Sequence, residues 1–77
     1  MTKQIDIQEL IPFMKKGWVA MDKSGEWWWY ENEPELVCAF GTTIPYGWHF
    51  TGKRKLLSDI APVSDWTKSL IKVGEQR

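Results

Sequence analysis

The chain is 77 residues long, the length of one small domain (residues 1–77), and its ten Lys and Arg balance its ten Asp and Glu. A chain of zero net charge has no built-in attraction to DNA or to an anionic membrane, which argues against direct DNA binding and against membrane association. One cysteine and one histidine exclude an internal disulfide and leave too few soft ligands for a structural zinc site.

A helix is predicted over residues 7–16. Asp6, followed three positions later by Glu9, has the sequence form of a capping box, and apolar residues then recur at helical spacing at Ile7, Leu10, Ile11 and Met14. Pro12 opposes this helix, because an interior proline costs about 3 kcal/mol. The alternative starts the helix nearer Pro12 and leaves residues 3–7 extended. Asp6, Glu9 and Pro12 also interrupt the amino-terminal segment before an apolar stretch of signal-peptide length can form, so we expect a cytosolic protein.

Residues 18–31 are predicted to form a β-hairpin. The apolar run W-V-A-M is followed by D-K-S-G, in which Asp suits the first position of a turn and Gly the last. E-W-W-W-Y then continues as the second strand. Because side chains alternate along a strand, Trp27 and Trp29 share one face while Trp28 and Tyr30 share the other. We expect the hydrophobic core to cover one of these aromatic faces. The other face must be covered by a second layer, a partner chain or a ligand.

The middle of the chain is predicted to alternate between loops and short strands. An acidic loop carries three carboxylates, on Glu31, Glu33 and Glu35. The apolar run 36–40 is a third strand, and the segment 42–47, which contains a proline and a glycine, is a connector. A fourth strand is predicted at W-H-F, which includes Trp48 and His49. An exposed basic turn follows it, with Lys53, Arg54 and Lys55.

A short amphipathic helix is predicted from Ser64, with an apolar stripe at Trp66, Leu70 and Val73. The order helix, three or four antiparallel strands, helix is typical of an α+β domain in which a helix near each end covers one face of a small sheet. Eleven aromatic residues in so short a chain can exceed what its interior holds. We therefore also predict self-association as a homo-oligomer.

Two segments carry a resemblance to a known group. V-A-M-D-K-S-G-E-W-W-W-Y-E-N-E-P at 19–34 and D-W-T-K-S-L-I-K-V-G at 65–74 resemble the beginning and end of a loose family of short accessory proteins encoded by tailed phages and prophages. The resemblance implies a bacterial host cytosol as the context and carries over no functional residues. The amino-terminal helix leading into Lys16-Gly17-Trp18 is also similar to small phage sponges that sequester immune-signalling nucleotides.

Catalysis is not indicated by the sequence. An enzyme needs a nucleophile with a base, a carboxylate pair in a cleft or a metal, and His49 has no Ser or Cys partner at a suggestive spacing. Cys38 lies in the apolar run L-V-C-A-F and is predicted to be a small buried hydrophobe. The acidic loop lacks the glycine and carbonyl pattern of a calcium site. We expect a protein that is not an enzyme and that has no cofactor and no metal.

Three binding roles remain open. The first is a stoichiometric counter-defence inhibitor, such as an anti-CRISPR-type protein, in which the acidic loop and exposed tryptophans occupy a basic surface of a host protein. The second is a nucleotide sponge, in which residues 27–30 and 48–49 form an aromatic platform edged by the basic residues 53–55. In the third, the rings join subunits of a structural assembly. Zero net charge and the acidic loop favour the protein target.

Overall fold

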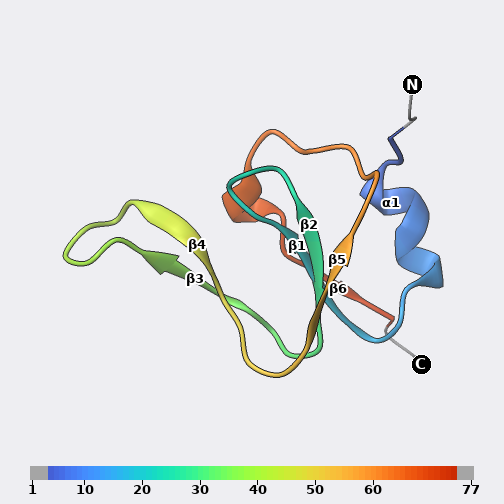
Figure 1. The fold of residues 1–77 in the computed structure, drawn as a ribbon, viewed down its shortest axis with the longest axis horizontal. Helices are drawn as coiled ribbons and strands as arrows, with labels where there is room; N and C mark the ends of the chain where they lie inside the picture. Colours follow the sequence, from blue (N-terminus) through green and yellow to red (C-terminus); the bar gives the residue numbers. More distant parts are fainter. Residues whose placement is uncertain (1–3, 75–77) are drawn as a thin grey trace.

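The computed structural model describes residues 4–74, and within them the strands form two separate antiparallel sheets (Figure 1). The main sheet has the order β5-β2-β1-β6, from strands Arg54–Leu57, Trp27–Tyr30, Gly17–Met21 and Ile71–Val73. The second sheet pairs β3 (Glu35–Cys38) with β4 (Pro45–His49). Each sheet is antiparallel and the helical content is small, so the α+β prediction holds only loosely.

The predicted first helix is shorter than expected. It begins as α1 (Ile7–Leu10), where the Asp6 carboxylate accepts the Gln8 N–H at 2.9 Å, and continues as a 3₁₀ turn, η1 (Ile11–Phe13). Pro12 lies at the start of that turn. Because proline has no N–H to continue the α-helical ladder, the chain tightens and then leaves the helix at Met14, which is extended.

The predicted helix from Ser64 is wrong. Only a single 3₁₀ turn forms, η2 (Trp66–Lys68), after which the chain becomes β6 and pairs with β1. The Ser69 hydroxyl accepts the Met21 N–H at 2.8 Å, which ties the end of the turn to β1. Ile71 and Val73 then alternate as in a strand, and Val73 is buried at 1% exposure. The apolar spacing that suggests a helix also fits this turn followed by a strand.

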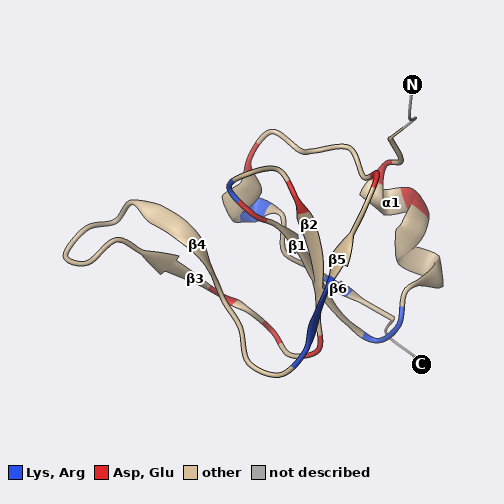
Figure 2. Ribbon diagram, viewed as in Figure 1, with Lys and Arg blue, Asp and Glu red and all other residues tan. Residues whose placement is uncertain are grey.

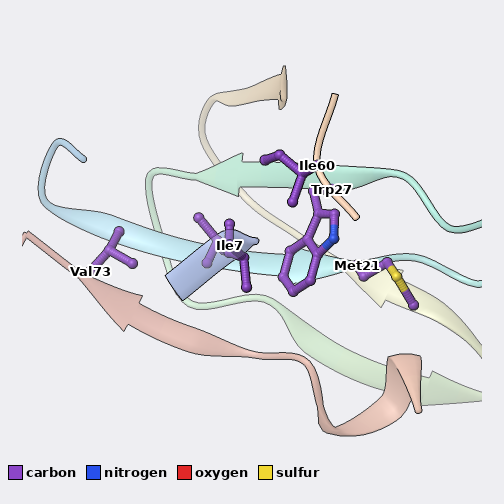
Figure 3. Close-up of a cluster of buried hydrophobic side chains, with 6 residues drawn as sticks. Ile7, Met21, Trp27, Ile60 and Val73 are labelled. Atoms are coloured by element: carbon purple, nitrogen blue, oxygen red, sulfur yellow. The ribbon is translucent and has the colours of Figure 1, made fainter. Parts of the chain in front are cut away.

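One face of the main sheet carries the hydrophobic core. Met21 and Trp27 point from β1 and β2 into it, and Ile7 from α1 covers them (Figure 3). Val19 of β1 belongs to the same cluster. Ile60 closes the same cluster and belongs to the one isolated parallel bridge among residues 4–74, which joins it to Ile5. The Trp27 indole donates to the Ala61 carbonyl at 3.1 Å, so the ring also holds this crossing segment in place.

The other face of the main sheet is covered by the same chain. Tyr30 is 1% exposed there, and its ring lies 5.6 Å from that of Phe50, which follows β4. The Trp48 indole donates to the Met21 carbonyl at 3.0 Å and meets the Trp66 ring edge-on at 6.3 Å. The base of the second sheet and Phe50 therefore provide the second layer that E-W-W-W-Y requires, and Trp66 of η2 contacts both this layer and the core cluster.

The predicted basic turn is partly wrong. Arg54 and Lys55 are not in a turn but open β5, which pairs with β2 so that Arg54 lies opposite Tyr30 and Lys55 opposite Trp29. Successive strand residues point to opposite faces, so these two cations lie on different faces of the main sheet. Pairing with a neighbour more than twenty residues away, rather than local sequence, produces this strand.

Gly17 allows the close approach of β1 and β2. A Cβ at this position would lie 2.6 Å from the Tyr30 carbonyl oxygen and 2.7 Å from Nε1 of Trp29. We predict that Gly17→Ala lowers the free energy of unfolding by about 1–3 kcal/mol, because the backbone oxygen cannot move without breaking strand pairing. Urea denaturation followed by tryptophan fluorescence measures this loss.

The matched control is Gly47→Ala, also in a strand, where a Cβ would meet no heavy atom within 4 Å. Its stability should stay within about 0.5 kcal/mol of the parent. Equal losses in the two variants would contradict the steric explanation.

Candidate functional site

The second sheet projects from the body of the molecule as an arm, defined here as residues 35–49 (Figure 1). Its strands pair Glu35 with His49 and Leu36 with Trp48, with an irregularity after Val37. The tip is closed by backbone hydrogen bonds, from the Ala39 N–H to the Ile44 carbonyl at 2.8 Å and from the Thr42 N–H to the Ala39 carbonyl at 3.0 Å. Only the base of this ribbon packs on the main sheet.

The arm carries large apolar side chains into solvent. Phe40 is 104% exposed and Ile44 64%, both at the tip, while Tyr46 and Leu36 are 58% and 40% exposed nearer the base. Cys38 is also exposed, so its prediction as a buried hydrophobe is wrong. Single apolar residues on a surface are ordinary, but a cluster on one projecting element is typical of an interaction surface.

The base of the arm is acidic. Residues 24–52 contain four Glu and no Lys, Arg or Asp. Figure 2 shows the acidic positions along the segment that leads into β3, whereas the arm beyond its first residue is uncharged. Glu31, Glu33 and Glu35 are all exposed, and Glu35 lies opposite His49, which is exposed as well. The predicted acidic loop, residues 31–35, is therefore the segment that leads from β2 into the arm.

The aromatic residues predicted as a binding platform lie apart from one another. Trp27 and Tyr30 are each 1% exposed and lie in the interior, on opposite faces of β2. Trp28 is half-buried, and the Arg54 guanidinium lies 4.0 Å from the centre of its ring and 4.5 Å from that of Phe50. The protein's own arginine thus occupies the stacking position that a nucleobase would need.

The predicted basic triplet is also divided. Lys53 uses its backbone to bridge to Glu31: its carbonyl accepts the Glu31 N–H at 2.9 Å, and its N–H donates to the Glu31 carboxylate at 3.1 Å. Arg54 lies on the face covered by the base of the arm, and Lys55 lies on the other face beside Trp29. Trp48 is half-buried at the junction of the arm and the main sheet.

A groove of about 310 Å³ separates β4 from the main sheet and is lined in part by Asp22, Tyr30, Trp48 and Arg54. Burial alone would raise the pKa of Asp22, but hydrogen bonds from Ser24, the Glu26 N–H and the Trp28 indole outweigh it and lower the pKa below its usual value. Burial raises the pKa of Tyr30, although Arg54 opposes the rise. Neither group titrates near neutrality, so the groove presents fixed charges rather than an acid–base pair.

The most exposed apolar residues of the arm were not among the sequence-based candidates. Phe40, Ile44 and Tyr46 flank Gly41 and Pro45, and the segment 42–47 reads as a connector from its turn-forming residues. In the structure Pro45 and Tyr46 already belong to β4. One feature of the sequence could have indicated these exposed residues: apolar residues recur on both sides of a glycine turn, within a stretch that has no Lys or Arg.

Comparison with known proteins identifies no relative: no family model matches the chain, and no curated protein or solved structure does either. Within residues 4–74, no group of three His, Cys, Asp or Glu side chains could hold a metal ion. No helix in the described part of the chain has the length and apolarity needed to cross a membrane. Any functional conclusion therefore rests on the geometry of the arm and the pockets.

Asp22 supports a pH-dependence prediction. Its carboxylate accepts the Ser24 hydroxyl at 2.6 Å and the Ser24 N–H at 3.0 Å, so the folded protein favours its ionised form. The lowered pKa means that this contribution is complete above the ordinary value of about 3.9 and is lost as the pH falls through the lower folded value. Asp22→Asn should therefore flatten the acid side of the stability profile.

The measurement is urea denaturation from neutral pH down to about pH 2, the range over which carboxylates in proteins titrate. Glu33→Gln, which removes an exposed carboxylate at the base of the arm, is the control and should leave the profile unchanged. An Asp22→Asn profile parallel to the parent's would show that these hydrogen bonds add nothing to stability.

Proposed function

We propose that this protein acts without catalysis, as a stoichiometric inhibitor that inserts its arm into a host protein. The observation that carries the proposal is the exposure of Phe40 and Ile44 at the tip of a ribbon that packs on its own chain only at the base. A two-stranded ribbon is marginally stable by itself in water. Its apolar tip gains burial only from a second molecule.

The apolar surface of the arm offsets only part of the cost of binding a partner. Burying an Ile, Leu or Phe side chain contributes roughly 1.5–3 kcal/mol, so Phe40, Ile44 and Leu36 together supply at most about 5–9 kcal/mol. Association costs an estimated 4–15 kcal/mol in lost freedom. The apolar contacts therefore need help from charges or from backbone pairing along the free edges of β3 and β4.

The charge distribution indicates what that help is. Glu31, Glu33 and Glu35 lie at the entrance to the arm, in a stretch without Lys or Arg. A partner with an apolar pocket bordered by basic side chains matches both features. Proteins that handle nucleic acid present such basic surfaces, since they bind phosphate. The resemblance to short phage and prophage proteins adds the context of counter-defence in a bacterial cytosol, as in an anti-CRISPR-type inhibitor.

A different protein is favoured over a second copy as the partner of the arm. A two-fold interface places the same patch of each subunit against itself. Two arms paired in this way offer no Lys or Arg to the acidic base of either copy, because residues 24–52 contain neither, so the charges of the base stay unmatched. The nucleotide-sponge alternative has less support at its predicted position, because Arg54 covers the Trp28 and Phe50 rings.

The proposal predicts that the tip of the arm is required for capture. A tagged protein should retain the same host protein in roughly one-to-one ratio across repeated pull-downs, and the double variant Phe40→Ser with Ile44→Ser should lose it. The loss follows from removing about 3–6 kcal/mol of apolar burial. The control is Leu56→Ser, which changes an exposed apolar residue of β5 outside the arm.

Charge is tested in the same assay. Glu33→Lys with Glu35→Lys should abolish capture, whereas Glu9→Lys on α1 should not. All six residues altered in these variants are exposed, so thermal unfolding of the variants should match the parent's. Retention of the same host protein by the tip variant would overturn the proposal, and so would a parent protein that retains nothing or only further copies of itself.

A further inference from the structure

A second pocket lies on the opposite side of the main sheet from the base of the arm. It has a volume of about 240 Å³ and is lined by five residues from three segments, Met14, Lys15, Trp29, Lys55 and Leu57. Strand pairing places Trp29 opposite Val19 and Lys55, on the face that carries the core. The base of the arm covers the other face, where Tyr30 meets Phe50.

The indole of Trp29 is held in place by its neighbours. Its N–H donates to the Lys15 carbonyl at 3.0 Å, which fixes the edge of the ring. The ring also lies close to Gly17, where an added Cβ would be 2.7 Å from both Nε1 and Cε2. A ring fixed in this way loses little freedom when a ligand packs on it, which is the condition for a preformed binding surface.

The charges of the pocket are of one sign. Among the described residues that line it, Lys15 and Lys55 are charged and none is acidic. The Lys15 ammonium lies 5.8 Å from the centre of the Trp29 ring, and Lys55 is the cross-strand neighbour of that tryptophan. The groove on the other face differs, because Asp22 shares it with Lys23 and Arg54. The pocket is therefore suited to an anion, whereas the carboxylate of Asp22 makes the groove less suited to one.

The apolar lining and the volume restrict the anion further. Met14, Leu57 and the indole supply an apolar surface, and indoles accept aromatic rings of different kinds, because each such ring has a π-face. The volume lies just below the usual 300–1,000 Å³ of ligand pockets, so it holds one ring system rather than a dinucleotide. Ammonium groups act as point charges and accept phosphate or carboxylate alike.

We propose that the pocket formed by Met14, Lys15, Trp29, Lys55 and Leu57 binds a small planar ring that carries a phosphate or carboxylate group. The ring packs on Trp29 and Leu57, and the anionic group lies between the two lysines. This site is separate from the arm, so it does not depend on the proposed inhibitor function. A host protein could be captured normally by a variant whose pocket has lost its ligand.

The test is an NMR titration that observes the indole N–H signals, with the signal of Trp29 identified from its loss in Trp29→Phe. Adenosine 5′-monophosphate is the phosphate probe and 2-naphthoate the carboxylate probe, each at millimolar concentration. At least one should shift the Trp29 signal saturably, and its neutral counterpart, adenosine or 2-naphthol, should bind about tenfold more weakly. Added salt should weaken binding of the charged probe.

Substitutions complete the test. Lys55→Gln and Lys15→Gln should each weaken binding about fivefold to tenfold, because each removes one nearby positive charge. Lys53→Gln is the matched control, an exposed lysine two positions from Lys55 in the same segment that does not line the pocket. Unchanged signals from the other tryptophans show that each variant is folded.

The outcomes separate the two anionic groups. Binding of the phosphate probe alone assigns a phosphate ligand, binding of the carboxylate probe alone assigns a carboxylate, and binding of both supports the shared chemistry. No saturable shift with either probe would overturn the proposal. Equal binding of charged and neutral probes, or equal binding by Lys55→Gln and the parent, would overturn it as well.

Discussion

Strand β2 buries Trp27 on one face of the main sheet and Tyr30 on the other, each to 1% exposure. A sheet with two buried faces needs two covering layers, and in a chain of 77 residues these layers use nearly all of the remaining sequence. The amino-terminal segment and the crossing at Ile60 cover one face. The base of the arm and Phe50 cover the other, and Trp66 of η2 contacts both the arm and the core cluster. The outer part of the arm is left without a covering layer of its own, which is why its apolar residues face solvent.

The zero net charge conceals an uneven distribution. Four of the eight lysines lie at 15, 16, 53 and 55, whereas residues 24–52 carry four Glu and no Lys or Arg. The arm therefore has an acidic base, while the pocket beside Trp29 has two lysines and no carboxylate in its lining. Composition alone argues against binding to anions in general. The folded arrangement instead gives each side of the molecule a local charge of its own, suited to a basic protein surface on one side and a small anion on the other.

Local chemistry explains which elements could be predicted from the sequence. The hairpin of β1 and β2 was predicted because Asp22 closes its own turn, accepting the Ser24 and Glu26 N–H groups within four residues. The cap at Asp6 is equally local. In contrast, β6 forms by pairing with β1 about fifty residues earlier, and β5 forms by pairing with β2. Pairing with these distant strands decides whether a segment with this apolar spacing becomes a helix or a strand. The residues within the segment do not indicate which strand it will pair with. The exposure of Phe40 could not be predicted for the same reason. Whether a second layer covers a run of apolar residues depends on segments that are distant in the sequence.

The indole groups explain why so thin a core uses tryptophan and why the surface anchors are other residues. Trp27, Trp29 and Trp48 each donate their N–H to a backbone carbonyl, at Ala61, Lys15 and Met21 respectively, and each bond joins segments that are distant in sequence. Trp28 donates to the Asp22 carboxylate at 3.3 Å. A buried indole must satisfy its donor, so each of these rings adds a fixed link as well as apolar area. This use places the rings inside or along the sheet, where parts of Trp27, Trp29 and Trp48 border pockets. Enrichment of tryptophan therefore indicates the framework here, and the residues best suited to bind a partner are the exposed side chains of the arm, of which Leu36, Phe40 and Ile44 have no polar group to satisfy.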